Sequence, residues 1–543
     1  MFRRDAFGRY DLGDFSTLDL TPSRRGFLRA AAGSGLLLTS GAIFDQRAWA
    51  DPVFAAYPFS LGVASGEPAP DGFVIWTKLA PKPFERNGGM PMKPVEVAWE
   101  IGSEQNMRTI LQRGVAVARP ELGHAVHVEI AGLQANRDYF YRFSVGGERT
   151  ITGRARTSPP PGAPLDRLSV GVVGCQRYDD GYFTAYRHVA EERFDVVFHY
   201  GDYIYEYRVV RPGERPLAVA RVMPTEPDVT YTLSDYRLRY AIYKSDPDLQ
   251  LAHASAPWLV SFDDHEVENN WADMHSEKPG VPPEIFALRR VAAFQAWYEH
   301  MPLRPSAMPR GAFIDAHRRF DFGTLAQFNV LDTRQHRTTQ PCGDGSHAAC
   351  ADALKPDNTM MGASQEAWLY DGFRSSGARW NVLAQQVMLM RHDRDPSPDK
   401  IGYSMDKWDG AVAARERLFK AIEESKLANP VVLTGDIHQN WAGELKADFD
   451  KASSKTLGVE FVATSITSGG DGADITRGGE VMLSKNPHMR FFNNQRGYMR
   501  HILTPERWQA DYRVLDRVSV AGAPVKTRKS FVVEAGKTVL ADA

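Results

Sequence analysis

Side chains that commonly bind metal ions follow five short apolar runs between residues 168 and 440. The five segments after these runs are Gly174-Cys175, Gly201-Asp202-Tyr203-Ile204-Tyr205, Asp263-Asp264-His265-Glu266, Asp332-Thr333-Arg334 and Gly435-Asp436-Ile437-His438. In open α/β sheets, ligand sites lie just beyond the carboxyl ends of the strands. We therefore expect thiol, carboxylate, phenol, imidazole and guanidinium groups to meet at one sheet edge, and together they indicate a metal site.

Taken singly, these residues also have ordinary structural interpretations. Asp202 and Tyr205 could be a turn residue and a core aromatic, although Gly201 permits the sharp strand exit that exposes a carboxylate. Asp264 and His265 could be a helix N-cap and a surface histidine. The coincidence of ligand types at five strand ends favours the metal site.

The last of these segments has the spacing of a ligand pair. Asp436 and His438 are separated by one residue. In an extended segment their side chains would point the same way, as two ligands of one ion would.

The donor types predict two different metal ions. Thiolate, phenolate, imidazole and carboxylate groups together suit a highly charged, oxidised iron. The remaining carboxylates and amides are hard oxygen donors, which suit calcium or magnesium. Two metals that share Asp202 would stabilise the attacking and leaving oxygens of a phosphoryl transfer. A nearby arginine and histidine could neutralise phosphate charge or protonate the leaving oxygen.

Short apolar runs alternate with helical segments from residue 168 onward. This pattern predicts strands buried on both faces in an α/β domain, which we expect to span residues 167–543. The expected strands are 168–173, 195–200, 258–262, 328–331, 382–384 and 431–433, and helices are expected at 233–243 and 411–425.

Residues 51–156 instead predict a small all-β sandwich of the fibronectin III kind. Period-2 alternation marks its expected strands at 72–77, 95–100, 124–130 and 139–145. Leu133 precedes Tyr139 by six residues, which resembles the tyrosine corner of sandwich domains. Residues 157–166 contain three successive prolines and predict a stiff linker.

The first 50 residues indicate a twin-arginine export signal. Arg24 and Arg25 lie in a polar, cationic segment, a weakly apolar stretch follows at 31–44, and Ala48-Trp49-Ala50 is a small-residue cleavage pattern. A chance arginine pair before an amphipathic helix is the alternative. The signal predicts export by the twin-arginine translocation machinery to the periplasm or the exterior, with no membrane anchor in the mature chain.

Composition excludes several classes of protein. The 543 residues are 43% hydrophobic and 24% charged, as in ordinary globular proteins. A formal net charge of −2 gives no basic surface excess, so we expect no stable nucleic-acid partner. No run of 18 apolar residues occurs, which argues against a polytopic membrane protein. With 3 cysteines, a disulfide scaffold is excluded.

The motifs resemble those of the PhoD-type alkaline phosphatase family, whose core is similar to calcineurin-like metallophosphoesterases and purple acid phosphatases. The segments that carry the resemblance are Gly201-Asp202-Tyr203-Ile204-Tyr205-Glu206-Tyr207, Asp263-Asp264-His265-Glu266-Val267-Glu268-Asn269-Asn270, Leu331-Asp332-Thr333-Arg334-Gln335, Trp408-Asp409-Gly410 and Gly435-Asp436-Ile437-His438. It implies a four-layer sandwich of two mixed sheets between helices. It also implies an enzyme that hydrolyses phosphate monoesters and diesters with one ferric ion and calcium.

The resemblance implies roles for individual residues. Cys175, Tyr205 and His438 would bind iron, and Asp202 would bridge the two metals.

Asp264 and Asp436 would hold calcium, with Asn269 or Asn270 completing that shell. His265 and Arg334 would act on the substrate or the leaving group. The wider metallophosphoesterases carry Asn where Asp264 stands here, so this chain departs from their pattern at a position that affects metal preference.

Two of the three cysteines lie in one Gly/Ser/Asp-rich loop. Cys342 and Cys350 are eight positions apart and could close a small disulfide in an oxidising compartment; two free surface thiols are the alternative. A disulfide there leaves Cys175 unpaired, as a metal ligand must be, although a lone cysteine can also be a buried hydrophobic residue.

Two alternative functions remain open at this point. A phospholipase D-like phosphodiesterase would use the same residues, because sequences of this type also include enzymes that cleave phospholipid headgroups. A non-catalytic extracellular binding protein would use the sandwich module to dock a polymer. The ligand-type residues at five strand ends argue against the second alternative.

Overall fold

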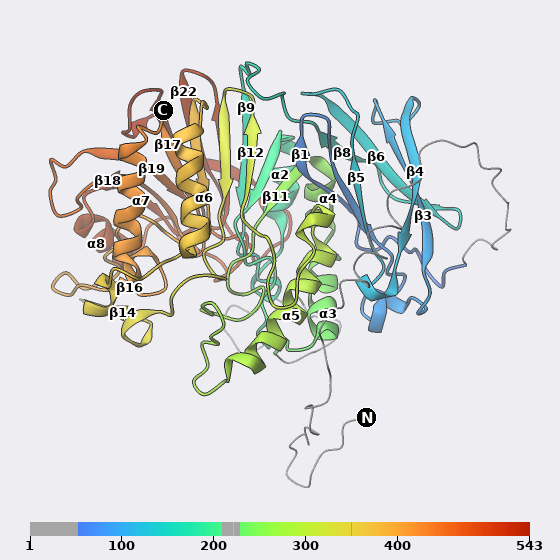
Figure 1. Ribbon diagram of the computed structural model, residues 1–543, viewed down its shortest axis with the longest axis horizontal. Coiled ribbons are helices and arrows are strands. Elements are labelled where there is room, and N and C mark those ends of the chain that lie inside the picture. The colour runs from blue at the N-terminus through green and yellow to red at the C-terminus, as the bar shows by residue number, and fades with distance from the viewer. Residues whose placement is uncertain (1–52, 209–220, 222–228, 349) are drawn as a thin grey trace, which may run out of the picture. The chain divides into compact units, whose positions relative to one another are not determined.

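The computed structural model describes residues 53–208, 221, 229–348 and 350–543 (Figure 1). The predicted export signal, residues 1–50, lies outside this described part. Residues 51–543 form one compact unit.

The first large sheet is mixed and has ten strands. Its centre is parallel, since β9, β10, β11 and β1 pair in the same direction, and antiparallel strands continue it on both sides. The strand order is β24 (Ala541–Asp542), β23 (Val525–Glu534), β22 (Arg507–Leu515), β21 (Gly497–Leu503), β9 (Leu168–Val173), β10 (Val196–His199), β11 (Pro257–Val260), β1 (Val63–Ala69), β2 (Gly72–Lys78) and β5 (Ala125–Ile130).

The second large sheet is also mixed and has seven strands. Four neighbours, β13, β15, β17 and β19, are parallel. The strand order is β12 (Arg318–Phe322), β13 (Ala326–Val330), β15 (Trp380–Ala384), β17 (Pro430–Thr434), β19 (Thr456–Val462), β18 (Asn440–Lys446) and β20 (Met489–Asn493).

Helices cover the outer faces of both sheets, so the fold has four layers. One core cluster joins the ten-stranded sheet to α2 (Thr184–Glu192), α3 (Leu233–Lys244), α4 (Pro247–Ser255) and α5 (Pro283–His300). A second cluster fills the space between the two sheets. A third joins the seven-stranded sheet to α6 (Gly362–Ser375), α7 (Val412–Glu424) and α8 (Arg477–Lys485) (Figure 1). The predicted four-layer α/β sandwich is confirmed.

The apolar runs predicted this core well. All six became strands, and each is buried along its whole length. The reason is that these strands lie between a helix layer and a second sheet, so neither face meets water. The helices predicted at 233–243 and 411–425 are α3 and α7.

The N-terminal strands form the predicted sandwich in an unexpected way. A separate sheet contains β3 (Val95–Gly102), β4 (Ile110–Ala118), β6 (Asp138–Val145), β7 (Glu148–Arg149) and β8 (Gly153–Arg156). It packs against β1, β2 and β5, which are themselves part of the ten-stranded sheet. The tyrosine corner is present, since the hydroxyl of Tyr139 bonds both the backbone N–H and the carbonyl of Gln134.

The boundaries predicted at residues 156 and 167 stay a prediction, but the sheet itself is continuous across them. Strand β1 pairs in parallel with β11, with Ser65 opposite Pro257. The segment between the two parts is also anchored, because Ser158 donates its N–H to Ala69 and Thr324 donates its N–H to Ala163. The N-terminal residues therefore widen the sheet that carries the candidate site.

Candidate metal centre

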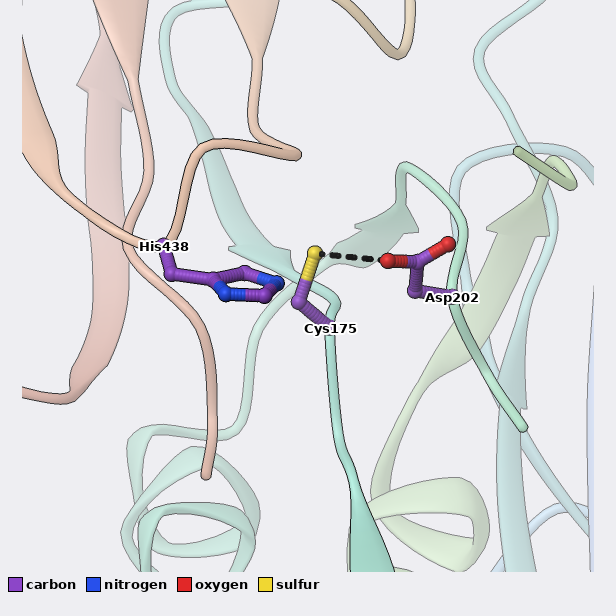
Figure 2. Close-up of side chains that lie close together, drawn as sticks. All are labelled: Cys175, Asp202 and His438. Carbon is purple, nitrogen blue, oxygen red and sulfur yellow. Dashed lines mark hydrogen bonds between the residues drawn. The ribbon is translucent and has the colours of Figure 1, made fainter. Parts of the chain in front are cut away.

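The strand ends converge as the sequence predicts. Cys175 follows β9, Asp202 follows β10 and His438 follows β17, and their ligand atoms lie within 4.8 Å of one another. The Cys175 thiol donates to Oδ2 of Asp202 at 3.4 Å. Figure 2 shows the three side chains pointing toward one another, with Cys175 between the other two.

Tyr205 completes this first group. Its hydroxyl donates to Oδ2 of Asp202 at 2.8 Å and lies 3.1 Å from Nε2 of His438. The hydroxyl of Ser468 contacts the same phenol oxygen at 2.8 Å. The three predicted iron ligands and the predicted bridging residue Asp202 therefore lie together, and Ser468 is a neighbour that sequence reasoning missed.

A second group of carboxylates lies beside the first. One carboxylate oxygen from each of Asp263, Asp264 and Asp436 lies within 4.8 Å of the others, and so do the ligand atoms of Asp202, Asp264 and His265, the last of which is a ring nitrogen. Asp202 thus belongs to two groups. Asp263 was not predicted as a ligand, although it stands directly before Asp264 in the motif at the end of β11.

The backbone is strained at four of the candidate ligands. The φ angles are 51° at Cys175, 55° at Asp202, 69° at Asp436 and 56° at His438, in the left-handed region that L residues rarely adopt. Such conformations persist only where the surrounding structure enforces them, and they gather at functional sites. This cluster of strained residues supports a functional role independently of the ligand types.

Gly201 has a clear steric role in this arrangement. Its φ is 133°, and a Cβ atom there would lie 2.5 Å from both the backbone nitrogen and Cβ of Asp263. Only glycine lets the two strand exits approach so closely. The close approach brings Asp202 and Asp263 side by side.

His265 is held in a fixed orientation. Its Nδ1 lies 2.7 Å from Oε2 of Glu206, and its ring packs on the ring of Tyr205 with centroids 4.2 Å apart. Burial alone would lower the pKa of His265, but the carboxylates of Asp264 and Glu206 outweigh burial and raise it well above its usual range. The contact with Glu206 leaves Nε2 for other partners.

Arg334 is fully buried among carboxylates. Its Nε donates to Asp263 at 2.6 Å, and its two terminal nitrogens donate to Asp406 at 2.7 and 3.0 Å. A terminal nitrogen also lies 3.8 Å from Asp264. Burial raises the pKa of Asp264, yet Arg334 and His265 reverse that effect and lower it to about 2. The predicted contact of Arg334 with substrate stays a prediction, since its described contacts are with acids.

The two candidate asparagines each donate a side-chain hydrogen bond to an acidic residue. The Asn269 amide donates to Glu277, and the Asn270 amide donates to Asp344 at 2.7 Å. The backbone N–H of Asn270 does reach Oδ2 of Asp264, at 2.8 Å. Their role as ligands stays a prediction.

The cysteines divide as predicted. Cys342 and Cys350 form a disulfide with Cα atoms 6.3 Å apart, and Cys175 is free and buried. The disulfide loop lies close to the second group, because it carries Asp344, the partner of Asn270.

The burial and the unpaired oxygens of the candidate ligands are compatible with bound metal ions. Burial raises the pKa values of Cys175, Tyr205 and Asp202 well above their usual ranges. For His438, whose charged form is the protonated one, the same burial lowers the pKa to about 3. Within the described residues, Oδ1 of Asp202 and Oδ2 of Asp263 are buried with no hydrogen-bond partner. Buried, unpaired carboxylate oxygens are costly, and a cation would remove that cost.

Comparison with known proteins agrees with this geometry. A family model described as "PhoD-like phosphatase" matches residues 170–512, and one described as "PhoD-like phosphatase, N-terminal domain" matches residues 46–159. The chain belongs to the PhoD-like phosphatase family. The predicted family is confirmed.

A curated relative and a solved structure each match nearly the whole chain. Alkaline phosphatase D of Bacillus subtilis (strain 168) is 47% identical over 526 residues, which cover 96% of this chain and 89% of the relative. The solved structure of PhoD matches with a TM-score of 0.87 and 47% identity, covering 90% of this chain and 93% of that one. As a PhoD-like phosphatase, the chain is a phosphoesterase hydrolase, and its ligand clusters indicate a metal-dependent one.

A cleft of about 340 Å³ opens beside Asp436 and His438. This volume is typical of small-molecule sites. Lys407 lines the cleft and forms an ion pair with Asp436; it precedes the Trp408-Asp409-Gly410 motif but was not singled out from the sequence. The remaining walls include Met388, Met390, Arg394, Gln439 and Met482.

No helix within the described part of the chain is long and apolar enough to cross a membrane.

Proposed function

We propose that this PhoD-like phosphatase is an exported enzyme that hydrolyses phosphate monoesters and diesters with one ferric ion and calcium. The observation that carries the proposal is that Asp202 belongs to two ligand groups, one with Cys175 and His438 and one with Asp264 and His265. Because a carboxylate has two oxygen atoms, Asp202 could bind a different metal ion with each oxygen.

The donor chemistry supports one metal in each group. Cys175, Tyr205 and His438 supply soft and anionic donors that suit ferric iron. Asp264 and Asp436 supply hard oxygens that suit calcium, and Asp263 is a third carboxylate of the same kind. Asn269 or Asn270 would complete the calcium shell.

Bound metals would activate a water molecule and neutralise the phosphate charge. The proton transfer to the leaving group would depend on the protein's own side chains. The water oxygen bonds to phosphorus and releases one proton to solvent, the ester P–O bond breaks with its electron pair on the leaving oxygen, and that oxygen takes up a proton. His265 is the proposed donor through Nε2, because Glu206 holds its Nδ1 at 2.7 Å and favours the charged form. Arg334, which contacts Asp263 and lies 3.8 Å from Asp264, is the proposed group that neutralises charge on the substrate or the leaving group.

Export follows from the first 50 residues. We propose that the twin-arginine machinery delivers the folded enzyme to the periplasm or the exterior and that the mature chain begins at Asp51. The Cys342–Cys350 disulfide supports an oxidising destination. Replacing Arg24 and Arg25 with lysine should leave uncleaved precursor in the cytoplasm, measured by fractionation and blotting; unchanged export would refute the twin-arginine route.

A phospholipase D-like phosphodiesterase is the second candidate. The cleft beside Asp436 and His438 supports it, because a diester carries a second organic group that needs space. Membership of a phosphatase family argues against a non-catalytic binding protein.

The deciding experiment measures hydrolysis of a monoester, a diester and a phospholipid by the parent and by His265→Asn. We expect the parent to hydrolyse the first two and His265→Asn to lose at least about 100-fold in kcat. Preference for the phospholipid would favour the second candidate. Hydrolysis of none of the three by metal-loaded parent would refute the proposed substrates.

A further inference from the structure

Glu266 joins the ends of two strands through a single carboxylate. It is fully buried and follows β11 by six residues. Its Oε2 accepts the backbone N–H of Asp202 at 3.1 Å and that of Asp263 at 2.9 Å. Its Oε1 accepts the backbone N–H of Tyr203. Three amides from the exits of β10 and β11 therefore share one acceptor group.

Two of these amides belong to residues with metal-ligand side chains. Asp202 has a φ of 55°, a conformation that needs outside support. The bond from its N–H to Glu266 supplies that support directly. Oε2 of Glu266 also accepts the backbone N–H of Asp263. Asp263 lies so close to Gly201 that a Cβ atom on residue 201 would clash with it. Glu266 thus fixes the backbone positions of Asp202 and Asp263, from which the two carboxylate side chains extend.

Glu266 itself belongs to none of the three ligand groups among the described residues. Its described hydrogen bonds are all with backbone amides, so it contacts no reacting group. We propose that Glu266 is a positioning residue that sets the spacing of Asp202 and Asp263 for a metal pair. This inference rests on the metal centre of the proposed function.

A purely structural role is the alternative, and the chain contains a matched control for it. Glu460, on β19, is also fully buried. Its two oxygens accept the backbone N–H groups of Leu389 at 2.9 Å and Met390 at 2.7 Å, and one also accepts the Thr434 hydroxyl at 2.9 Å. The same chemistry therefore holds two amides after β15 whose residues, Leu389 and Met390, are not candidate ligands; the third contact, with the Thr434 hydroxyl, lies at the end of β17, two residues before Asp436.

The experiment compares Glu266→Gln with Glu460→Gln in the full chain. Glutamine replaces one acceptor oxygen with an NH₂ group, which cannot accept the amide hydrogens. Metal affinity is measured by chelator competition with iron and calcium, and stability by urea unfolding of the metal-free protein. We expect similar losses of stability in both variants. Only Glu266→Gln should lose metal affinity, by about 10- to 100-fold, as is usual when a partner that orients ligands is removed.

Two results would overturn the proposal: metal affinity in Glu266→Gln equal to that of the parent, or an equal loss in Glu460→Gln. Glu266→Asp is the second variant, because it keeps the charge while lengthening the three contacts, and it should lose affinity by a smaller factor. If both Glu266 variants fail to fold while Glu460→Gln folds, the role is structural and the proposal is wrong. A parent that binds no metal would instead refute the proposed function.

Discussion

The phenol oxygen of Tyr205 lies 2.8 Å from Oδ2 of Asp202, three residues away in the chain. The contact forms because the strand exit at Gly201 turns sharply and Asp202 adopts a left-handed backbone. The turn brings the Tyr205 hydroxyl back to the aspartate and to within 3.1 Å of Nε2 of His438. One short segment thus supplies both a candidate bridging carboxylate and a candidate phenolate.

Replacing Tyr205 with phenylalanine tests the phenolate. The ring and its packing on His265 remain, so the fold should be retained, with a loss of about 1 kcal/mol for the hydroxyl hydrogen bond. Visible absorption of the iron-loaded protein should disappear, because a ferric phenolate absorbs visible light. Tyr207→Phe, whose ring also contacts that of His265, is the control and should keep its colour. An absorption band that persists in Tyr205→Phe would exclude Tyr205 as a ligand.

The cysteines should separate stability from activity. Cys342→Ser with Cys350→Ser opens a small loop and should cost about 2–3 kcal/mol of unfolding free energy, while hydrolysis stays measurable. Cys175→Ser keeps a side chain of similar size but removes the thiolate, so it should lose iron and activity at little cost in stability. Urea unfolding and phosphate release measure the two effects. Equal effects from the two changes would show that this division of roles is wrong.

Stability should fall in mild acid. His501 is buried and its Nδ1 accepts the indole N–H of Trp508 at 3.0 Å, and burial lowers its pKa to about 3. In the unfolded chain histidine has a pKa of about 6.5. Between these values the unfolded state binds the extra proton, so the unfolding free energy falls as pH falls.

Between pH 7 and pH 5, His501 alone should account for a loss of about 2 kcal/mol. His501→Gln should be less stable than the parent at pH 7 but should lose about that much less on acidification. Urea unfolding at the two pH values measures the difference, and the exposed His336→Gln is the control. If the parent and His501→Gln respond equally to pH, burial does not lower the pKa of His501 and this explanation is wrong.

The strand ends could be predicted from the sequence because a ligand-type residue after an apolar run is a local signal. Cys175, Asp202 and His438 were found in this way. Glu206 and Ser468 were not, because each acts through a contact between segments distant in the chain. Ser468 follows β19 and reaches Tyr205 across 263 positions, and nothing in its own neighbourhood indicates that contact.

Two other features depend on packing that no single segment reveals. The action of Arg334 on the substrate stays a prediction, but its hydrogen bonds to Asp263 and Asp406 could not be predicted from its own segment. The N-terminal strands form a β-sandwich as predicted, but the pairing of β1 with β11 could not be predicted from either segment. Alternation of apolar and polar residues predicts which face of a strand is buried. The same alternation is found in a strand of an isolated sheet and in a strand that extends a larger sheet, so it does not predict the pairing.

The metal content of Asp202→Ala tests the central claim most directly. A bridging carboxylate screens the repulsion between two nearby cations, so its loss should lower iron and calcium together and abolish turnover. Asp436→Ala should chiefly deplete calcium, and His438→Ala chiefly iron. The measurement is elemental analysis of each purified variant beside the parent, with hydrolysis of a chromogenic monoester and diester. We predict joint depletion in Asp202→Ala; both metals at parental stoichiometry in that variant would contradict a bridging Asp202.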